Sequence, residues 1–360
     1  MTETISFKSY VGHRVREVLV HADILSHRKR PRLLMLPSHG RVQCSLLRVY
    51  NLVPELKKLG WTPLVVPHQL EAGQRDRVMR HFDPDLIFLQ KSRHPLNDPE
   101  HLQERPYIYD LDDADFLDEK LAAKTARTCR SASAVIAGSR FVAEWCKQYN
   151  AETHVVWTGA PVSSGSRRPH ADRDPILAWA QSDPNGYPQE FDFVEDLVHR
   201  LACKGVAFRL RLYGWRDDAP ETRLVRMRQA GVQVDTVPFI KYDRFVHSLQ
   251  EVAVGISPVI VSSEYSRGKS FGKILAYLDA MVPVVASDEV DHADFFTSGS
   301  GVLSNDPETW AREIADLLGD AGRRETMTQE AFSRFRNLLS REAAARQVSD
   351  VMRTAMGTEG

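Results

Sequence analysis

The feature that most constrains the fold is a regular alternation of short apolar runs with stretches of helical spacing. Runs such as 33–36 and 86–89 are bounded by turn residues, as buried strands are. Between them, apolar residues recur at spacings of three and four, for example over 46–59. Strands that alternate with helices form right-handed βαβ units, whose parallel sheet is covered on both faces. The pattern therefore predicts an α/β chain.

The alternation runs through the chain twice, and the two series are separated by a segment near 159–174 that is rich in Gly, Pro, Ser, Arg and Asp, as linkers are. The apolar runs expected as strands are 33–36, 64–66, 86–89, 107–109, 134–137 and 153–157, then 176–179, 208–213, 232–236, 252–256, 284–286 and 301–303. The helical patterns are 46–59, 72–82, 119–130, 139–149, 189–203, 220–230, 242–250, 270–281, 307–318 and 322–352.

These series predict two doubly wound, Rossmann-like domains facing a cleft. We expect an N-terminal extension at 1–30 with one short helix over 15–25, a first domain at 31–165 and a second at 175–335. A length of 360 residues agrees with two domains, because single hydrophobic cores stop growing at roughly 250–300 residues. Ligands of such sheets bind beyond the carboxyl ends of the strands, so the site is expected there.

Charge and cysteine content exclude several functions. The chain has 47 basic and 48 acidic residues, without the surplus of Lys and Arg that a nucleic-acid binder needs. The four cysteines are far apart and indicate neither a zinc site nor a disulfide framework. Neither a signal peptide nor an apolar run of about 20 residues is present, and no segment reads as an amphipathic anchor. We therefore expect a soluble, cytoplasmic protein without a transmembrane segment.

The segment 266–287, with its Lys-Ser, Lys-x-Leu-x-Tyr and Pro-Val-Val-Ala-Ser, carries a specific resemblance. It resembles the donor-site signature of the retaining, nucleotide-sugar-dependent glycosyltransferases with the GT-B fold (family four). The resemblance continues through Asp306-Pro307-Glu308 and extends, more loosely, over most of 32–335. It implies transfer of a sugar from a nucleotide-diphosphate donor in the C-terminal half to a hydroxyl, without metal or other cofactor. The acceptor would be a glycan, a lipid-linked compound or a small molecule.

The chemistry of this segment agrees with a diphosphate site. Unpaired N–H groups and a partial positive charge are expected at the start of the helix that begins near Ser270. Glycines leave room for phosphates, and nearby cations balance their charge. The expected diphosphate-binding residues are Arg267, Gly268, Lys269, Ser270 and Lys273. The alternative is a basic, solvated loop that caps a helix.

One position departs from the resemblance. The family usually has a glutamate in Leu-Glu-Tyr, taken to bind the donor ribose, where this chain has Ala276, and the acid eight residues earlier is replaced by Gly268. This leaves open a non-catalytic relative that serves as a binding or scaffold subunit. The resemblance further implies that the C-terminal helix, within 336–360, packs back towards the first domain.

Other candidates follow strand ends. In the second half, the resemblance places Gln181, Ser182, Gly214, Phe239 and Ile240 near the nucleotide or donor. In the first half it places polar residues on the acceptor or cleft side, and these are His39, Gly40, Arg41, Asp110, Asp112 and Asp113. For the loop at 38–45, an N-terminal cap is an equal alternative. The aspartates could hold an acceptor hydroxyl or cap a helix, and a metal site is the least favoured reading.

Overall fold

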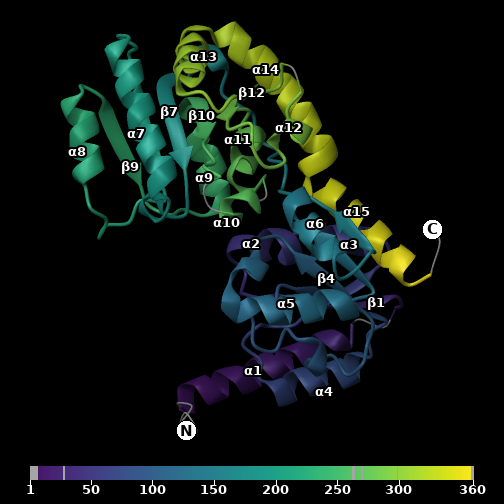
Figure 1. Ribbon diagram of the computed structural model, residues 1–360. Coiled ribbons are helices and arrows are strands. Elements are labelled where there is room, and N and C mark those ends of the chain that lie inside the picture. Colours follow the sequence, from purple (N-terminus) through teal and green to yellow (C-terminus); the bar gives the residue numbers. More distant parts are fainter. Residues whose placement is uncertain (1–6, 27–28, 262–263, 270, 298, 358–360) are drawn as a thin grey trace. The chain divides into compact units, whose positions relative to one another are not determined.

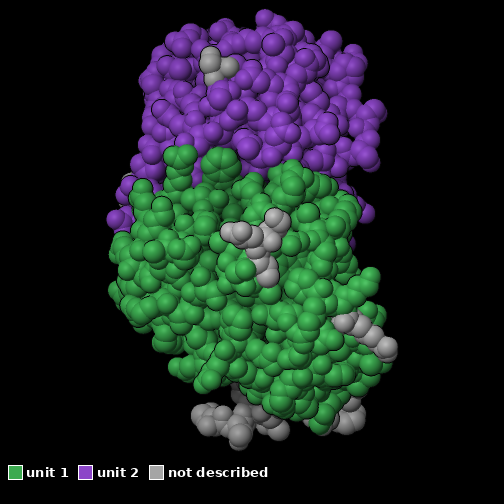
Figure 2. Space-filling model, turned by 90° about the vertical axis from the view of Figure 1, so that its right-hand side faces the viewer, with its two compact units in different colours: residues 1–159, 341–360 green, residues 160–340 purple. Residues whose placement is uncertain are grey.

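The chain divides into two compact units, residues 1–159 with 341–360 (unit 1) and residues 160–340 (unit 2) (Figure 2). A computed structural model describes residues 7–26, 29–261, 264–269, 271–297 and 299–357 (Figure 1). Within these residues, no helix is long and apolar enough to cross a lipid bilayer.

Unit 1 is built on a six-stranded parallel sheet in the order β2-β1-β3-β4-β5-β6. Its strands are β1 Arg32–Leu36, β2 Thr62–Val65, β3 Leu86–Gln90, β4 Tyr107–Leu111, β5 Ala134–Ala137 and β6 Thr153–Val155. Its α-helices are α1 Phe7–Ile24, α2 Gln43–Ser45, α3 Val53–Lys58, α4 Ala72–Phe82, α5 Glu119–Ser131, α6 Arg140–Lys147 and α15 Arg341–Ala355. A π-helical turn, Leu46–Tyr50, joins α2 to α3, and 3₁₀ turns are Pro99–His101 and Asp115–Leu117.

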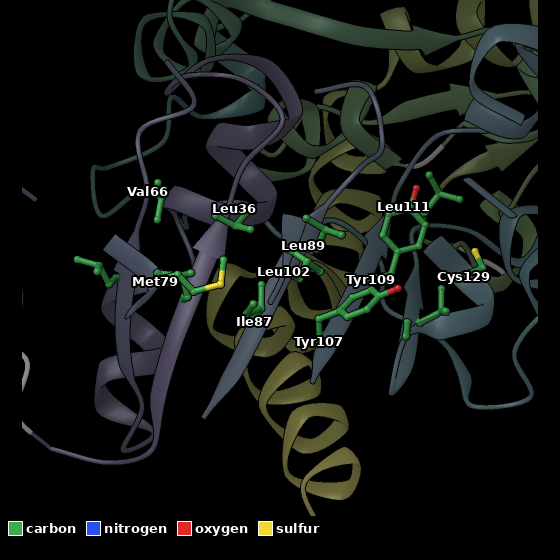
Figure 3. Close-up of a cluster of buried hydrophobic side chains, with 14 of the residues drawn as sticks. Leu36, Val66, Met79, Ile87, Leu89, Leu102, Tyr107, Tyr109, Leu111 and Cys129 are labelled. Atoms are coloured by element: carbon green, nitrogen blue, oxygen red, sulfur yellow. The ribbon is translucent and has the colours of Figure 1, made fainter. Parts of the chain in front are cut away.

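Helices on both faces give unit 1 two hydrophobic layers. On one face, side chains of β1, β3 and β4 meet those of α4 and α5, for example Leu36 with Met79 and Tyr109 with Cys129 (Figure 3). On the other face, α15 contributes Val348 to a second core, and Trp61 Nε1 donates to Ser349 Oγ over 2.8 Å. The C-terminal helix is therefore part of the core of unit 1.

Unit 2 has a second six-stranded parallel sheet, in the order β12-β11-β10-β7-β8-β9. Its strands are β7 Asp174–Ala180, β8 Arg209–Tyr213, β9 Gln233–Val237, β10 Val252–Ser257, β11 Val284–Ala286 and β12 Val302–Leu303. Its α-helices are α7 Pro188–Cys203, α8 Thr222–Gln229, α9 Tyr242–Ser248, α10 Glu264–Arg267, α11 Leu275–Asp279, α12 His292–Phe295, α13 Pro307–Gly319 and α14 Ala321–Arg334. A π-helical turn is Phe335–Leu339, and 3₁₀ turns are His170–Asp172, Pro184–Gly186, Leu249–Glu251 and Phe271–Lys273.

The predicted fold class of two doubly wound, Rossmann-like domains is confirmed by these two sheets. Three predicted helices differ from the structure in length or regularity. The long helix expected over 322–352 is interrupted, because Ser340 is extended and Ala160 N–H donates to Leu339 O over 2.9 Å. The helix expected over 46–59 contains a π-helical turn. The third, 270–281, bears on the site and is described below.

Candidate functional site

The candidate site of unit 2 lies where its strand order reverses. The chain leaves β7 towards β8 on one side, and later strands β10 and β11 lie on the other side of β7. Ligands of doubly wound sheets bind at the carboxyl ends of the two strands that flank such a switch point. A pocket opens there, directly after β7 and β10. It is lined by Gln181, Ser257, Pro258, Val259, Lys269, Phe271, Ile274, Val290 and His292.

Lys269 supplies a positive charge to this pocket. Its side chain is 15% exposed, and its Nζ lies 3.9 Å from Glu190 Oε1 and 3.9 Å from the centre of the Tyr187 ring. Both neighbours stand at the start of α7, a helix of 16 residues. The N-terminal end of a helix carries a partial positive charge. The Glu190 carboxylate partly offsets the charge of the lysine. Lys269 and the helix end are the two positive groups here that an anion such as a phosphate group can contact.

Gln181 adds an unused hydrogen-bonding group. Its Oε1 is buried and has no hydrogen-bond partner among the described residues, which makes it available to a donor on a ligand. The backbone of Gln181 packs closely against Gly214, which follows β8. A Cβ at Gly214 would lie only 1.9 Å from Gln181 O. The predicted Gln181, Gly214 and Lys269 thus belong to one neighbourhood, with Ser182 following directly and exposed.

His292 is a pocket residue that the sequence did not indicate. Its Nδ1 lies 3.0 Å from Ser287 O, and burial lowers the pKa of the imidazole, so the ring is neutral at pH 7. The Ser287 hydroxyl in turn accepts the Val259 N–H over 2.9 Å. These bonds fix the loop after β10, one wall of the pocket. Glu190 was also missed, because only the fold brings α7 to Lys269.

The helix expected to begin near Ser270 is much shorter than predicted. Ser270 lies outside the described residues, 271–273 form a 3₁₀ turn, and α11 covers only Leu275–Asp279. Glycine is a poor helix former, so Gly268 and Gly272 account for the late start. The helix end near the pocket is therefore that of α7, which corrects the expectation of an N-terminus at Ser270.

The remaining donor-side candidates are more scattered. Arg267 is the exposed last residue of α10, and the adjacent Gly268 is buried. The side chain of Lys273 lies outside the described part of the chain. Phe239 is exposed and Ile240 half-buried in the loop after β9, an edge strand, and neither lines the pocket.

Unit 1 has its own switch point, between β1 and β3, and His39 follows β1 there. Its Nδ1 lies 2.7 Å from Ser38 Oγ, and its N–H donates to Ser45 Oγ over 3.1 Å. Burial, with Lys91 and Arg93 nearby, lowers the pKa of His39, so that it is neutral at pH 7. A neutral imidazole can accept a proton, which is what a general base for a hydroxyl has to do.

The other residues of this loop differ in their surroundings. Gly40 packs closely, because a Cβ there would lie 3.1 Å from the His68 ring. Arg41 is exposed, and its guanidinium lies 5.4 Å from the centre of the Tyr50 ring. Of the two, only Arg41 presents a charged group to solvent.

Asp110 does not fit the acceptor role expected from the sequence. It is completely buried and forms an ion pair with Arg48, whose Nε donates to Asp110 Oδ2 over 3.2 Å. Arg48 Nη1 also donates to Val156 O over 2.7 Å. Both carboxylate oxygens accept hydrogen bonds from Arg48, and the pair joins the π-helical turn to β4. With Asp110 completely buried, an acceptor in solvent does not reach it.

Asp112 and Asp113 both contact Lys91, a buried residue directly after β3 that the sequence did not indicate. Lys91 Nζ lies 2.8 Å from Asp112 Oδ1. Burial disfavours its charge, but the two carboxylates outweigh burial and raise the pKa of Lys91 well above its usual range. Next to this cluster, Arg93 donates to Asp115 Oδ1 over 2.6 Å. Among the described residues, no three His, Cys, Asp or Glu side chains form a metal-binding group.

Comparisons with known proteins agree with this architecture. No protein-family model matches the chain, and no curated protein is significantly similar to it in sequence. Among solved structures, the chain is similar to sucrose-phosphate synthase from Thermosynechococcus elongatus, with a TM-score of 0.69 and 15% identity over 92% of this chain and 100% of that one. It is similar to Anabaena HepE in complex with UDP and glucose, with a TM-score of 0.65 and 15% identity over 90% of this chain and 100% of that one. It is also similar to a glycosyltransferase from Rickettsia africae, with a TM-score of 0.68 and 12% identity over 92% of this chain and 100% of that one. The chain therefore has the GT-B fold of glycosyltransferases.

Proposed function

We propose that this chain is a glycosyltransferase that takes a sugar from a nucleotide-diphosphate donor bound in unit 2. The observation that carries the proposal is the pocket at the β7/β10 switch point, where Lys269 stands beside the N-terminal end of α7. The structural similarity supports it, because HepE, of the same fold, was solved with UDP and glucose. The acceptor is a hydroxyl of a glycan, a lipid-linked compound or a small molecule, on the side of His39 and Arg41.

In this proposal, positively charged groups of the chain itself stabilise the leaving nucleoside diphosphate. When the bond between sugar and diphosphate breaks, negative charge develops on the leaving phosphate oxygens, and fixed positive groups lower the free energy of that transition state. Lys269 and the α7 end supply this charge, assisted by Arg267 and Lys273. A metal ion is then not needed, and no cofactor beyond the nucleotide sugar is required. We assign retention of the anomeric configuration on the resemblance of 266–287 alone.

The Ala276 departure remains compatible with catalysis. Ala276 is buried in α11 and is not among the residues that line the pocket. A glutamate there would have to bury its carboxylate or displace its neighbours, because Ala276 is buried, and burying an unpaired charge costs stability. We therefore propose that the ribose is held by other groups of the pocket, such as the Gln181 amide. The alternative, a non-catalytic binding subunit, predicts nucleotide binding without turnover.

The test is release of nucleoside diphosphate from UDP-, GDP-, ADP- and dTDP-sugars in the presence of a panel of hydroxyl acceptors. We expect turnover with one nucleotide series and a loss of about a hundredfold in Lys269→Ala, the size seen when one stabilising group is removed from a developing anion. The matched control is Lys204→Ala. Lys204 caps the opposite end of α7, about 24 Å from its start at 1.5 Å per residue.

Equal loss in both variants, or unchanged turnover in Lys269→Ala, would contradict the assignment of Lys269. Absence of turnover with every donor, combined with tight binding of one nucleotide, would favour the non-catalytic alternative. Absence of both would overturn the proposed function.

A further inference from the structure

Helix α1 exposes an apolar face that the described residues of unit 1 leave uncovered. Large hydrophobic side chains are exposed at Val15 (52%), Val18 (66%) and Leu19 (63%) of the helix and at Leu25 (62%), which directly follows it. The spacings of three and four place Val15, Val18 and Leu19 on one side of the helix, and the exposed Ala22 continues that side. We call these five residues the α1 stripe.

The opposite face of α1 is fixed to unit 1. Val20 and Ile24 are buried in the core, and Glu17 accepts from Arg77 Nε over 2.6 Å and from Gln74 Nε2 over 2.9 Å, both on α4. The hydrogen bond from Arg77 is the main reason that the pKa of Glu17 falls to about 2. Figure 1 shows α1 running alongside α4. The outward direction of the stripe is thus set by specific contacts.

The sequence concealed this arrangement. Glu17 lies in the middle of the apolar pattern and is buried, whereas its apolar neighbours Val18 and Leu19 are exposed. Glutamate ordinarily lies in solvent, so this arrangement is not evident from the sequence. The α4 contacts account for it, because they give the carboxylate hydrogen-bond donors.

Charge indicates what the stripe contacts. Residues 7–30 contain six Lys or Arg and only two acidic residues. Of these, the acidic Glu17 is buried and the basic Arg30 pairs with Asp83 and Asp85. Arg14 is 57% exposed at one end of the stripe, and Lys29 is exposed just beyond the other end. A helix that combines an outward apolar face with basic flanks has the character of helices that lie in the surface of a membrane containing anionic lipids.

We infer that α1 docks unit 1 onto an anionic lipid surface, with the α1 stripe inserted between the headgroups and the basic flanks on their phosphates. A second copy of this chain fits less well. In an antiparallel pairing of two stripes, Arg14 of one copy would meet Lys29 of the other, and in a parallel pairing each basic end would face its own equivalent. Both arrangements bring like charges together. The inference does not depend on the proposed enzymatic activity.

The test is sedimentation of the full chain with lipid vesicles. We expect binding to vesicles that contain phosphatidylglycerol, weak binding to pure phosphatidylcholine, and a decrease as salt rises, because salt screens the basic flanks. The variant Val18→Ser/Leu19→Ser should partition about tenfold more weakly, since it removes two apolar side chains from the contact. Both positions are exposed, so the thermal unfolding midpoint should not change. Val225→Ser is the control, because Val225 is 44% exposed on α8 of unit 2.

Two outcomes would overturn the inference. The first is absence of wild-type binding to phosphatidylglycerol vesicles, or equal binding by the wild type and the Val18→Ser/Leu19→Ser variant. The second is a wild-type dimer in sedimentation velocity that becomes a monomer in the same variant, which would assign the stripe to a second copy. Nucleotide-sugar turnover, measured in parallel without lipid, reports on the proposed function separately.

Discussion

At the scale of single residues, the site of unit 2 depends on a close backbone contact at Gly214 that leaves no space for a side chain. Gly214 has a φ of 83°, and the space where a Cβ would stand is filled by the carbonyl oxygen of Gln181. Two strand ends, β7 and β8, can therefore lie at the spacing that shapes the pocket only if this residue is glycine. Gly214 is a structural part of the site rather than a group that binds ligand through a side chain.

We predict that Gly214→Ala lowers the free energy of unfolding of unit 2 by more than about 2 kcal/mol. The cost of a positive φ in alanine and the cost of the clash with the Gln181 carbonyl add to one another. Gly205→Ala is the control. Gly205 also has a positive φ, 71°, but nothing lies within 4 Å of its Cβ position, so about 1 kcal/mol is expected. Urea denaturation measures both. Equal costs in the two variants would show that the Gln181 contact does not constrain the turn.

The aspartates of unit 1 show why residue type alone cannot assign a role. Asp110, Asp112 and Asp113 follow one another at the end of β4, and sequence reasoning treated them alike. In the fold, Asp110 is buried against Arg48, whereas Asp112 and Asp113 neutralise the buried Lys91. Their partners come from other strands and helices, at sequence separations that local patterns do not reveal.

At the scale of elements, the apolar periodicity predicted the strands and the bounds of most helices, such as α4 and α13, but not the breaks within others. All twelve apolar runs correspond to strands, because a buried parallel strand needs a continuous apolar run. Helix ends depend on tertiary contacts instead. The break before α15 coincides with the bridge between Ala160 and Ser340, and α11 shrinks to five residues beside two glycines. Gln181 was expected from the family resemblance, and Lys269 from the resemblance and its place before a helix, whereas α7 as the neighbour of Lys269 was not expected.

The segment that follows the unit boundary is tied to α14 by a buried histidine. His170 Nε2 lies 2.9 Å from Thr328 Oγ1, and its Nδ1 has no hydrogen-bond partner among the described residues. Burial, with Arg173 and Arg324 nearby, lowers the pKa of His170 to about 3. The unfolded chain binds a proton near pH 6.5, whereas the folded chain stays neutral to about pH 3. The stability of unit 2 is therefore full above pH 6.5 and falls as the pH drops below it.

We predict that this histidine makes unit 2 about 2 kcal/mol less stable at pH 5 than at pH 7.5. His170→Gln keeps a group that can bond Thr328 but cannot titrate, so its stability should fall less over the same range. Urea unfolding at the two pH values, followed by a probe in unit 2, measures the difference. If wild type and variant lost the same free energy, the pH dependence would belong to other groups.

At the scale of the whole molecule, the chain builds two doubly wound units and then returns, with α15, to the core of the first. Each unit has a strand switch point whose loops carry polar and charged groups, His39 and Lys91 in one and Gln181 and Lys269 in the other. In the proposed function, unit 2 binds the donor and unit 1 the acceptor, since each sheet offers one binding edge. The fold was predictable because it repeats a local pattern, and the acceptor was not, because no local pattern encodes it.

The measurement that tests the central claim most directly is the thermal shift of the full chain with UDP, GDP, ADP and dTDP. A ligand at about 100 times its dissociation constant should stabilise the unit that binds it by ~2.7 kcal/mol. We predict that one of the four raises the unfolding midpoint of the wild type and of Lys204→Ala, and that Lys269→Ala loses most of this shift. A shift that survives unchanged in Lys269→Ala, or no shift with any nucleotide, would contradict a nucleotide-diphosphate donor in the pocket of unit 2.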